Sequence, residues 1–287
     1  MKEQAEGSAA KAAPTGVDVV IAGIGMVGAV LAVLLAREGW TVAMVDPRPG
    51  PLDSDDLPGS VPAPRVSALT PVSRRLLEGL GAWPRIDAWR ATPYTAMQVW
   101  DADGSGEVGF RADQAGVPVL GHIVENDVIL AALEAELSRL PQVQRLHGRK
   151  VVALDDGAVR RRVTLDDGSV LAAPLVVGAD GARSPLRELA GIAVREQDTG
   201  QCALVTTVKT ERRHGGVARQ AFLATGPLAF LPLTVAGDSH YCSIVWSTTP
   251  QEAERLAALS PAALGQAMAE ALDHRLGAVE VLDEARS

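Results

Sequence analysis

Residues 17–46 hold a strand, a glycine-rich turn, a helix and a second strand in immediate succession, and this order leaves few folds open. Residues 17–22 form a short apolar strand, and residues 27–38 form an Ala- and Leu-rich helix that stops at Gly39. Residues 41–45 form a second apolar strand, rich in valine. Two strands joined by a helix pair in parallel through a right-handed crossover. The sequence therefore predicts an α/β fold that opens with a Rossmann-like βαβ unit.

The same region contains eighteen consecutive residues, 19–36, without a charge, which is the length of a membrane span. Asp18 precedes this run, glycines crowd its first half, and the next apolar run ends in Asp46. A buried strand followed by a buried helix accounts for the same residues. We therefore expect no transmembrane segment.

The turn at residues 23–28 reads GIGMVG, a GxGxxG motif placed between strand and helix. In such a turn Gly23 permits a tight bend and Gly25 lets a pyrophosphate approach the backbone. Gly28 lets the helix pack closely on the strand. The motif in this position predicts a dinucleotide site.

Two further features support that site. The first N–H groups of the helix, at Met26 and Val27, lie at the positive end of the helix dipole and suit phosphate oxygens. Asp46 ends the second strand, where its carboxylate can accept hydrogen bonds from the adenosine ribose. These residues leave the choice between NAD and FAD open.

The chain is acidic, with a formal net charge of -8 over 287 residues. An acidic surface repels phosphate backbones, so we expect no nucleic-acid partner. Cys202 and Cys242 form no paired motif and the five histidines are scattered. The sequence therefore predicts neither a disulfide framework nor a metal site, and a cytoplasmic location fits.

After the opening unit the pattern changes from α/β to α+β. Residues 202–246 alternate like an antiparallel sheet, and Thr249 and Ser260 each precede a proline at a helix start. The predicted fold class is α/β with an α+β insertion, in which an antiparallel-sheet substrate domain accompanies the nucleotide-binding domain. The predicted ranges are 1–16 for a disordered leader, 17–91 and 120–200 for the nucleotide-binding domain, 92–119 and 201–248 for the sheet, and 249–287 for a helical segment.

A second motif, GADGARS, lies at residues 178–184 after a short buried strand at residues 175–177. A helix-like segment follows, with Pro185 at its start. A strand that ends in small residues and an acid, followed by a helix, places the Asp180 carboxylate and backbone N–H groups where a ligand can lie.

Five stretches make the chain resemble the FAD-dependent aromatic hydroxylases, the group A flavin monooxygenases, and within them the ubiquinone-biosynthesis branch. They are DVVIAGIGMVGAVLAVLLAREG (18–39), RVSALTPVSRRLLEGLGAW (65–83), HIVENDVILAAL (122–133), VVGADGARSPLRELAGI (176–192) and ATGPLAFLPL (224–233). They occur in the family's order and cover most of residues 18–246. The resemblance implies that the nucleotide-binding domain holds FAD and that NADPH or NADH is the reductant.

The resemblance also implies roles for individual residues. The glycine turn and Asp46 would hold the pyrophosphate and the adenosine ribose, and Arg65 would contact the phosphate–ribityl region. Either Glu125 or Asn126 would contact the ribityl chain, and Asp180 would serve both FAD and NADPH. The full set expected to bind cofactor is Gly23, Gly25, Met26, Val27, Gly28, Asp46, Arg65, Glu125, Asn126, Asp180, Gly181 and Arg183.

The implied reaction is the hydroxylation of an aromatic ring with O₂, on a prenylated phenol or quinol of ubiquinone biosynthesis. The flavin supplies the difficult chemistry, and the sequence nominates no catalytic residue. His240 and Tyr241 lie in the sheet block, where packing is the simpler explanation. Apolar residues such as Phe222, Leu228 and Leu231 either line a channel for the prenyl tail or form core. Association with the inner membrane face or with a biosynthetic complex stays open.

The chain departs from the family at its end. Such hydroxylases carry a late Gly-Asp-Ala-Ala-His motif, and the nearest string here, residues 237–240, lacks the alanines and lies in the wrong position. We therefore expect a truncated reading, a fragment, or a partner that supplies the rest. Two alternatives to a hydroxylase stay open: an inactive flavin-binding or scaffold protein of the same family, and an NAD-dependent reductase.

Overall fold

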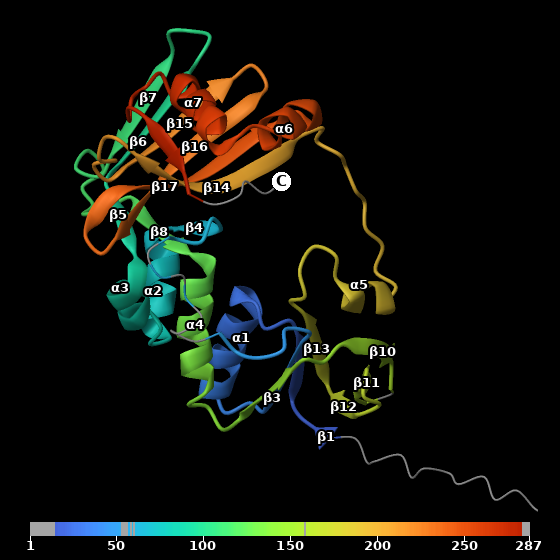
Figure 1. Ribbon diagram of the computed structural model, residues 1–287. Helices are drawn as coiled ribbons and strands as arrows, with labels where there is room; N and C mark the ends of the chain where they lie inside the picture. The colour runs from blue at the N-terminus through green and yellow to red at the C-terminus, as the bar shows by residue number, and fades with distance from the viewer. Residues whose placement is uncertain (1–14, 53–56, 58, 60, 158, 283–287) are drawn as a thin grey trace, which may run out of the picture. The chain divides into compact units, whose positions relative to one another are not determined.

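The structure is a computed structural model that describes residues 15–52, 57, 59, 61–157 and 159–282. The chain forms two compact units (Figure 1). Of the described residues, those up to 51 and those from 133 to 195 belong to unit 1, and those from 52 to 132 and from 196 onward belong to unit 2. The predicted leader lies outside the described residues except for Thr15 and Gly16, which form strand β1.

A four-stranded parallel sheet in the order β13-β2-β3-β9 forms the base of unit 1. Its strands are β13 (Leu175–Gly178), β2 (Val19–Ala22), β3 (Val42–Asp46) and β9 (Val143–His147). Between β2 and β3 runs α1 (Met26–Arg37), which buries a stripe of small residues that includes Gly28, Ala29 and Ala32. Their helical spacing puts them on one face. The predicted parallel βαβ unit is confirmed.

A second sheet in unit 1 has the order β1-β12-β11-β10. It contains β10 (Val151–Asp155), β11 (Arg161–Leu165) and β12 (Val170–Ala173). Apolar side chains from both sheets, among them Val20, Val45 and Leu165, form one buried cluster. The short helix α5 (Pro185–Leu189) follows β13. The cluster holds β10 beside the carboxyl ends of the parallel strands.

A seven-stranded sheet in the order β18-β14-β17-β16-β15-β6-β7 dominates unit 2. The strands are β6 (Ala96–Asp101), β7 (Glu107–Arg111), β14 (Cys202–Thr210), β15 (Val217–Leu223), β16 (Gly226–Val235), β17 (Asp238–Thr248) and β18 (Val279–Val281). Figure 1 shows α6 (Pro250–Ala257) and α7 (Pro261–Ala271) over one face of this sheet. Leu228 and Phe230 of the sheet share a core with Leu256 and Met268 of these helices. The predicted antiparallel block is confirmed, with β6 and β15 as its one parallel pair among the strand pairings described.

A smaller sheet in unit 2 has the order β4-β8-β5, with β4 (Val66–Leu69), β5 (Thr92–Tyr94) and β8 (Gly121–Glu125). Two helices accompany it, α2 (Pro71–Gly79) and α3 (Trp83–Arg90). Thr70 caps α2 by accepting a hydrogen bond from the Ser73 N–H, as its place before proline predicts. After β8 the chain enters α4 (Asn126–Leu137), whose last turns belong to unit 1.

Two features differ from the sequence-based expectations. Residues 279–281 form β18, which pairs with β14 although the sequence indicated only helices after residue 249. Residues 52–91 and 120–132 group with unit 2, whereas the sequence placed residues 17–91 and 120–200 together. The assignment of ranges to a flavin domain and a substrate domain stays a prediction. Among the described helices none is long and apolar enough to cross a membrane.

Candidate functional site

The glycine turn between β2 and α1 uses its three glycines in two different ways. A Cβ at Gly23, where φ is +102°, would lie 2.2 Å from the carbonyl oxygen of Ala179. A Cβ at Gly28 would lie 2.1 Å from the carbonyl oxygen of Gly23, but one at Gly25 would meet no atom within 4 Å. Gly23 and Gly28 therefore permit close packing, whereas Gly25 borders open space.

The N-terminus of α1 lies within the glycine turn. Gly25 is the N-cap residue, no side chain caps the helix, and the first turn contains no acidic residue. The first N–H groups of a helix have no partner within the helix, and the dipole adds partial positive charge there. The turn at Met26 and Val27 is therefore suited to an anion such as a phosphate.

Asp46 ends β3 beside this turn, and backbone groups orient its carboxylate. Oδ2 accepts a hydrogen bond from the Ile24 N–H at 2.7 Å, and Oδ1 accepts one from the Arg48 N–H at 2.9 Å. A carboxylate oxygen has two lone-pair sites, so each can accept a further hydrogen bond. The half-buried carboxylate can therefore also accept from sugar hydroxyls.

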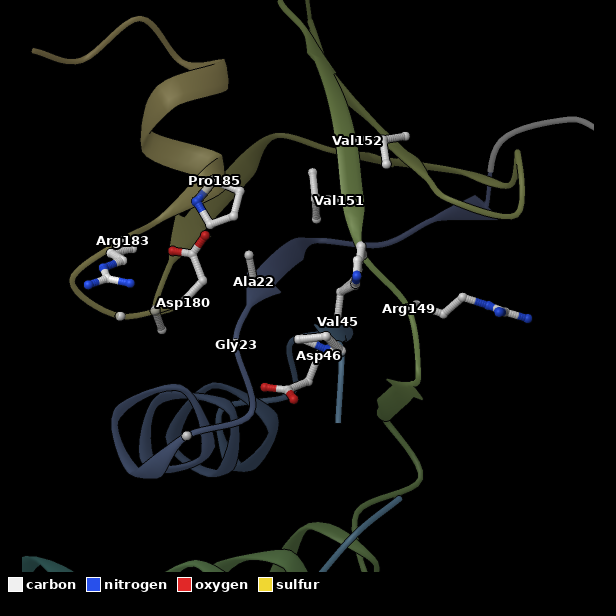
Figure 2. Close-up of a pocket in the computed structure, with 15 residues that line it drawn as sticks. Ala22, Gly23, Val45, Asp46, Arg149, Val151, Val152, Asp180, Arg183 and Pro185 are labelled. Carbon is white, nitrogen blue, oxygen red and sulfur yellow. The ribbon is translucent and has the colours of Figure 1, made fainter. Parts of the chain in front are cut away.

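The turn, Asp46 and the segment after β13 line one cavity of about 740 Å³ (Figure 2). Lys150, Val151 and Val152, at the start of β10, line it as well. Figure 2 shows the Arg149 side chain directed away from the pocket, and its Nε lies 2.9 Å from the Asp167 carboxylate. The sequence did not single out these residues, because β10 carries no motif. The volume is that of a typical small-molecule or cofactor site.

Asp180 reaches the same cavity because β13 lies beside β2. The Ala179 N–H donates to the Ala22 carbonyl oxygen at 2.7 Å, which ties the two motifs together. The Asp180 carboxylate accepts hydrogen bonds from Ser184 Oγ at 2.5 Å and from the Leu186 N–H at 3.0 Å. It therefore organises the start of α5 as well as bordering the cavity.

Gly181 and Arg183 complete this side of the site. Gly181 has a φ of +88°, and a Cβ there would meet no atom within 4 Å. Arg183 is exposed, and Figure 2 shows it on the same side of the pocket as Asp180. The predicted residues that line this cavity are Gly23, Gly25, Asp46, Asp180, Gly181 and Arg183.

Three other predicted residues, Arg65, Glu125 and Asn126, form a cluster in unit 2. The Asn126 N–H donates to the Arg65 carbonyl oxygen at 3.0 Å, and Asn126 Oδ1 accepts from Ser67 Oγ at 2.7 Å. Arg65 is exposed and Asn126 is half-buried. Because Oδ1 faces Ser67, the amide nitrogen of Asn126 is the group suited to meet a ligand.

Glu125, its neighbour, is directed into the protein. It is fully buried, its Oε1 lies 2.9 Å from Arg90 Nε, and its Oε2 accepts a hydrogen bond from the Ala63 N–H at 2.5 Å. Burial raises the pKa of Glu125, while the Ala63 N–H and the Arg90 charge act in the opposite direction. Of the two residues that the sequence left open, the geometry therefore favours Asn126 as the ligand contact.

The apolar residues of the large sheet divide between its two faces. Leu228 and Phe230 belong to the core under α6 and α7, so they do not line a channel. Phe222 and Leu231 alternate with them and lie on the other face, with Phe222 48% exposed and Leu231 half-buried. Of the residues named for a prenyl-tail channel, Phe222 and Leu231 are the ones that lie where they could line it.

His240 and Tyr241 are held by neighbouring side chains. His240 Nδ1 hydrogen-bonds to the Asp238 carboxylate, and this bond is the main cause that lowers the pKa of Asp238 to about 2. Lys209 Nζ lies 5.1 Å from the ring centroid of Tyr241 and 3.2 Å from Asp238. These contacts account for both residues as parts of a surface charge cluster.

Comparison with known proteins places these features in a family. The protein-family model described as the FAD binding domain matches residues 16–286 of this chain. Escherichia coli (strain K12) 3-demethoxyubiquinol 3-hydroxylase is 35% identical over 266 residues, which are 92% of this chain and 66% of that protein. The human ubiquinone biosynthesis monooxygenase COQ6 is 34% identical over 257 residues, 84% of this chain and 53% of that protein. The chain thus spans between about half and two thirds of the length of these relatives.

Solved structures share the fold. Pseudomonas aeruginosa PqsL, in complex with 2-aminobenzoylacetate, superposes with a TM-score of 0.72 at 23% identity, over 94% of this chain and 74% of that one. The flavin-dependent monooxygenase PieE, in complex with FAD and substrate, gives 0.70 at 17% identity, over 96% and 50%. The resemblance read from the sequence is confirmed, and the chain belongs to the FAD binding domain family.

Proposed function

We propose that this protein is an FAD-dependent, NAD(P)H-using monooxygenase that hydroxylates an aromatic ring. The observation that carries this proposal is the open space at Gly25, which adjoins an uncapped helix N-terminus and the Asp46 carboxylate in one cavity. The names of the relatives support a polyprenyl phenol or quinol of ubiquinone biosynthesis as the substrate.

In unit 1 the proposed roles follow the geometry. The N–H groups at Gly25, Met26 and Val27 bind the pyrophosphate, and Asp46 binds the adenosine ribose. Asp180, with the Gly181 N–H and the Arg183 side chain, borders the cavity where the rest of FAD or NADPH would lie. Gly23 and Gly28 act through packing.

In unit 2 we propose that Arg65 and Asn126 contact the phosphate–ribityl part of FAD, and that Glu125 stabilises their loop. When bound, the flavin supplies the redox chemistry with O₂. The residues of this chain hold it, orient it and shape the place of the ring. We assign no acid or base.

The helix-free face of the large sheet is the proposed wall of the substrate site. The pairing register aligns one residue from each of six neighbouring strands on this face, and all of them except Gln220 of β15 are apolar. The apolar residues are Val205, Val245, Ala229, Val99 and Val108, and all are half-buried or exposed. An apolar surface of this kind suits an aromatic ring with a prenyl tail.

The test is the visible absorbance spectrum of the purified protein, with release and identification of the bound flavin. Near-stoichiometric FAD, followed by NADPH oxidation that depends on a prenylated phenol and yields a hydroxylated product, would support the proposal. Bound FAD without turnover would indicate the inactive flavin-binding alternative. NAD binding without flavin would indicate the reductase.

A prenylated substrate lies in a membrane, so we also propose that the protein is cytoplasmic and meets the inner membrane face peripherally. Co-sedimentation with phospholipid vesicles that contain a prenylated quinone tests this. Equal recovery in the supernatant with and without vesicles would contradict it.

A further inference from the structure

The side chain of Arg48 connects the glycine turn to two other segments of unit 1. Its Nη2 donates to the Ile24 carbonyl oxygen at 3.3 Å and to Glu134 Oε1 at 2.6 Å. Its Nη1 donates to the Gly50 carbonyl oxygen at 2.9 Å. One guanidinium therefore fixes the turn, the loop after β3 and the end of α4 relative to one another.

Glu134 is the anion at the centre of this arrangement. Its side chain is 2% exposed, Oε1 faces Arg48, and Oε2 lies 3.1 Å from Arg145 Nη1 and 3.8 Å from His147 Nε2. A buried ion pair contributes little net stability, because apolar side chains of similar volume often stabilise a fold equally well. Stability alone therefore does not explain why Glu134 is charged at this position.

Asp46 and Arg48 both hydrogen-bond to the backbone of Ile24, the residue between Gly23 and Gly25. The Ile24 N–H donates to Asp46 Oδ2, and the Ile24 carbonyl oxygen accepts from Arg48. Asp46 Oδ1 in turn accepts from the Arg48 N–H. Both polar backbone groups of Ile24 are thus held by Asp46 and Arg48, so the peptide planes of the turn have one orientation.

We infer that Arg48 and Glu134 are positioning residues for the dinucleotide. Glu134 holds Arg48 against Ile24, which keeps the N–H groups of the turn and the Asp46 carboxylate oriented before a ligand binds. A preformed site binds more tightly because less ordering accompanies association. The identity of the ligand as FAD rests on the proposed function, but the ordering of the turn does not.

Arg145 offers a matched control. The Arg145→Gln and Arg48→Gln variants each remove one guanidinium from Glu134, and the two side chains are 24% and 23% exposed. Of the two, Arg48 alone has a described hydrogen bond to the turn. In a fluorescence titration with FAD, Arg48→Gln should weaken binding about tenfold, the effect of losing one charge-assisted hydrogen bond. Arg145→Gln should weaken it by about twofold or less.

Hydrogen exchange of the ligand-free protein gives a readout independent of flavin. Arg48→Gln should speed exchange in the peptide that contains residues 22–28, and Arg145→Gln should not. If the wild-type protein binds no FAD, the proposed function fails. The hydrogen-exchange rates of residues 22–28 in the two variants still show whether Arg48 orders the turn. Equal effects of the two variants on the turn, or an unchanged turn in Arg48→Gln, would overturn it.

A further variant covers the case in which Arg48→Gln does not fold. Arg48→Lys keeps a positive charge beside Glu134 but cannot make the forked contact with Ile24 and Gly50. It should restore the melting temperature, and the faster exchange of residues 22–28 should remain. An exchange rate equal to that of the wild type would overturn the inference.

Discussion

The carbonyl oxygen of Gly23 lies 2.1 Å from the point where a Cβ at Gly28 would stand, so α1 packs on the turn at a distance that only glycine permits. Gly25, between them in sequence, has a φ of −82° and borders open space. One motif therefore combines glycines needed by the fold with a glycine that faces the cavity.

This difference predicts opposite outcomes for two alanine substitutions. Gly25→Ala should leave the melting temperature nearly unchanged and weaken FAD binding about tenfold or more, because the new methyl group occupies the approach of the pyrophosphate. Gly28→Ala should destabilise the fold by about 1–3 kcal/mol through overpacking. Thermal unfolding by circular dichroism and flavin titration measure the two effects. A Gly25→Ala protein that binds FAD like the wild type would exclude the pyrophosphate from this turn.

Substitutions at Asn126 and Glu125 should have different effects on FAD affinity and on the free energy of unfolding. Asn126→Asp keeps the acceptor for Ser67 but replaces the amide donor, so FAD affinity should fall several-fold with little change in unfolding free energy. Glu125→Gln removes the carboxylate from Arg90 and should destabilise the protein by about 3–5 kcal/mol, as for other broken buried pairs.

Urea unfolding and flavin titration at one pH distinguish these outcomes. FAD affinity of the folded fraction of Glu125→Gln should match the wild type. If Glu125→Gln is instead as stable as the wild type but binds FAD weakly, Glu125 and not Asn126 contacts the ligand.

The parts of the fold that were predictable are those with local causes. The caps at Thr70, Thr249 and Ser260 come from one hydroxyl and a nearby N–H, and all three form as expected. The βαβ unit follows from hydrophobic periodicity and glycine placement within thirty residues. Strands β14 to β17 of the seven-stranded sheet were recognisable from the alternation of residues 202–246, whereas the strand order and β18 were not.

What the sequence left undecided depends on contacts between distant segments. Glu125 and Asn126 are adjacent, and only the approach of Ala63 and Arg90 decides which one is buried. Arg48 meets Glu134 from 86 positions away, and no motif marks either residue. The strand β18 is three residues long, and its pairing with β14 is what makes it a strand.

His214 gives a prediction about pH. It is buried, its Nδ1 accepts the Gly216 N–H at 3.0 Å, and its Nε2 lies 3.0 Å from the Leu233 carbonyl oxygen. This geometry requires the neutral ring with a proton on Nε2. Burial is the main cause that lowers the pKa of His214 below its ordinary value near 6.5.

A lowered pKa means that the unfolded chain binds the His214 proton more readily than the folded chain does. The stability contribution of the neutral ring is therefore present above about pH 6.5 and is lost as the pH falls below it, by at most about 1.4 kcal/mol per pH unit. Between pH 7.5 and pH 5.5 the free energy of unfolding, measured with urea, should fall less in His214→Gln than in the wild type. Equal losses of unfolding free energy in His214→Gln and in the wild type would contradict this role for His214.

Phe222 and Phe230 test whether the helix-free face of the large sheet binds substrate. Phe230 is 1% exposed in the core under α6 and α7, so Phe230→Ala should cost about 3–5 kcal/mol of unfolding free energy. Phe222 is 48% exposed on the other face, so Phe222→Ala should cost well under about 1 kcal/mol. The two substitutions remove the same side chain from opposite faces of one sheet.

Activity then separates a substrate wall from an ordinary surface. If a prenyl tail lies on the helix-free face, Phe222→Ala should raise KM for a prenylated phenol several-fold, since burying a phenyl group contributes about 1.5–3 kcal/mol at most. The kcat should change little, because in this proposal Phe222 contacts the tail and not the reacting atoms of the ring. A phenol with the same ring and no tail should show equal KM in Phe222→Ala and wild type. If both substrates are affected equally, or neither is, the tail does not contact Phe222 and the substrate must be sought on another surface.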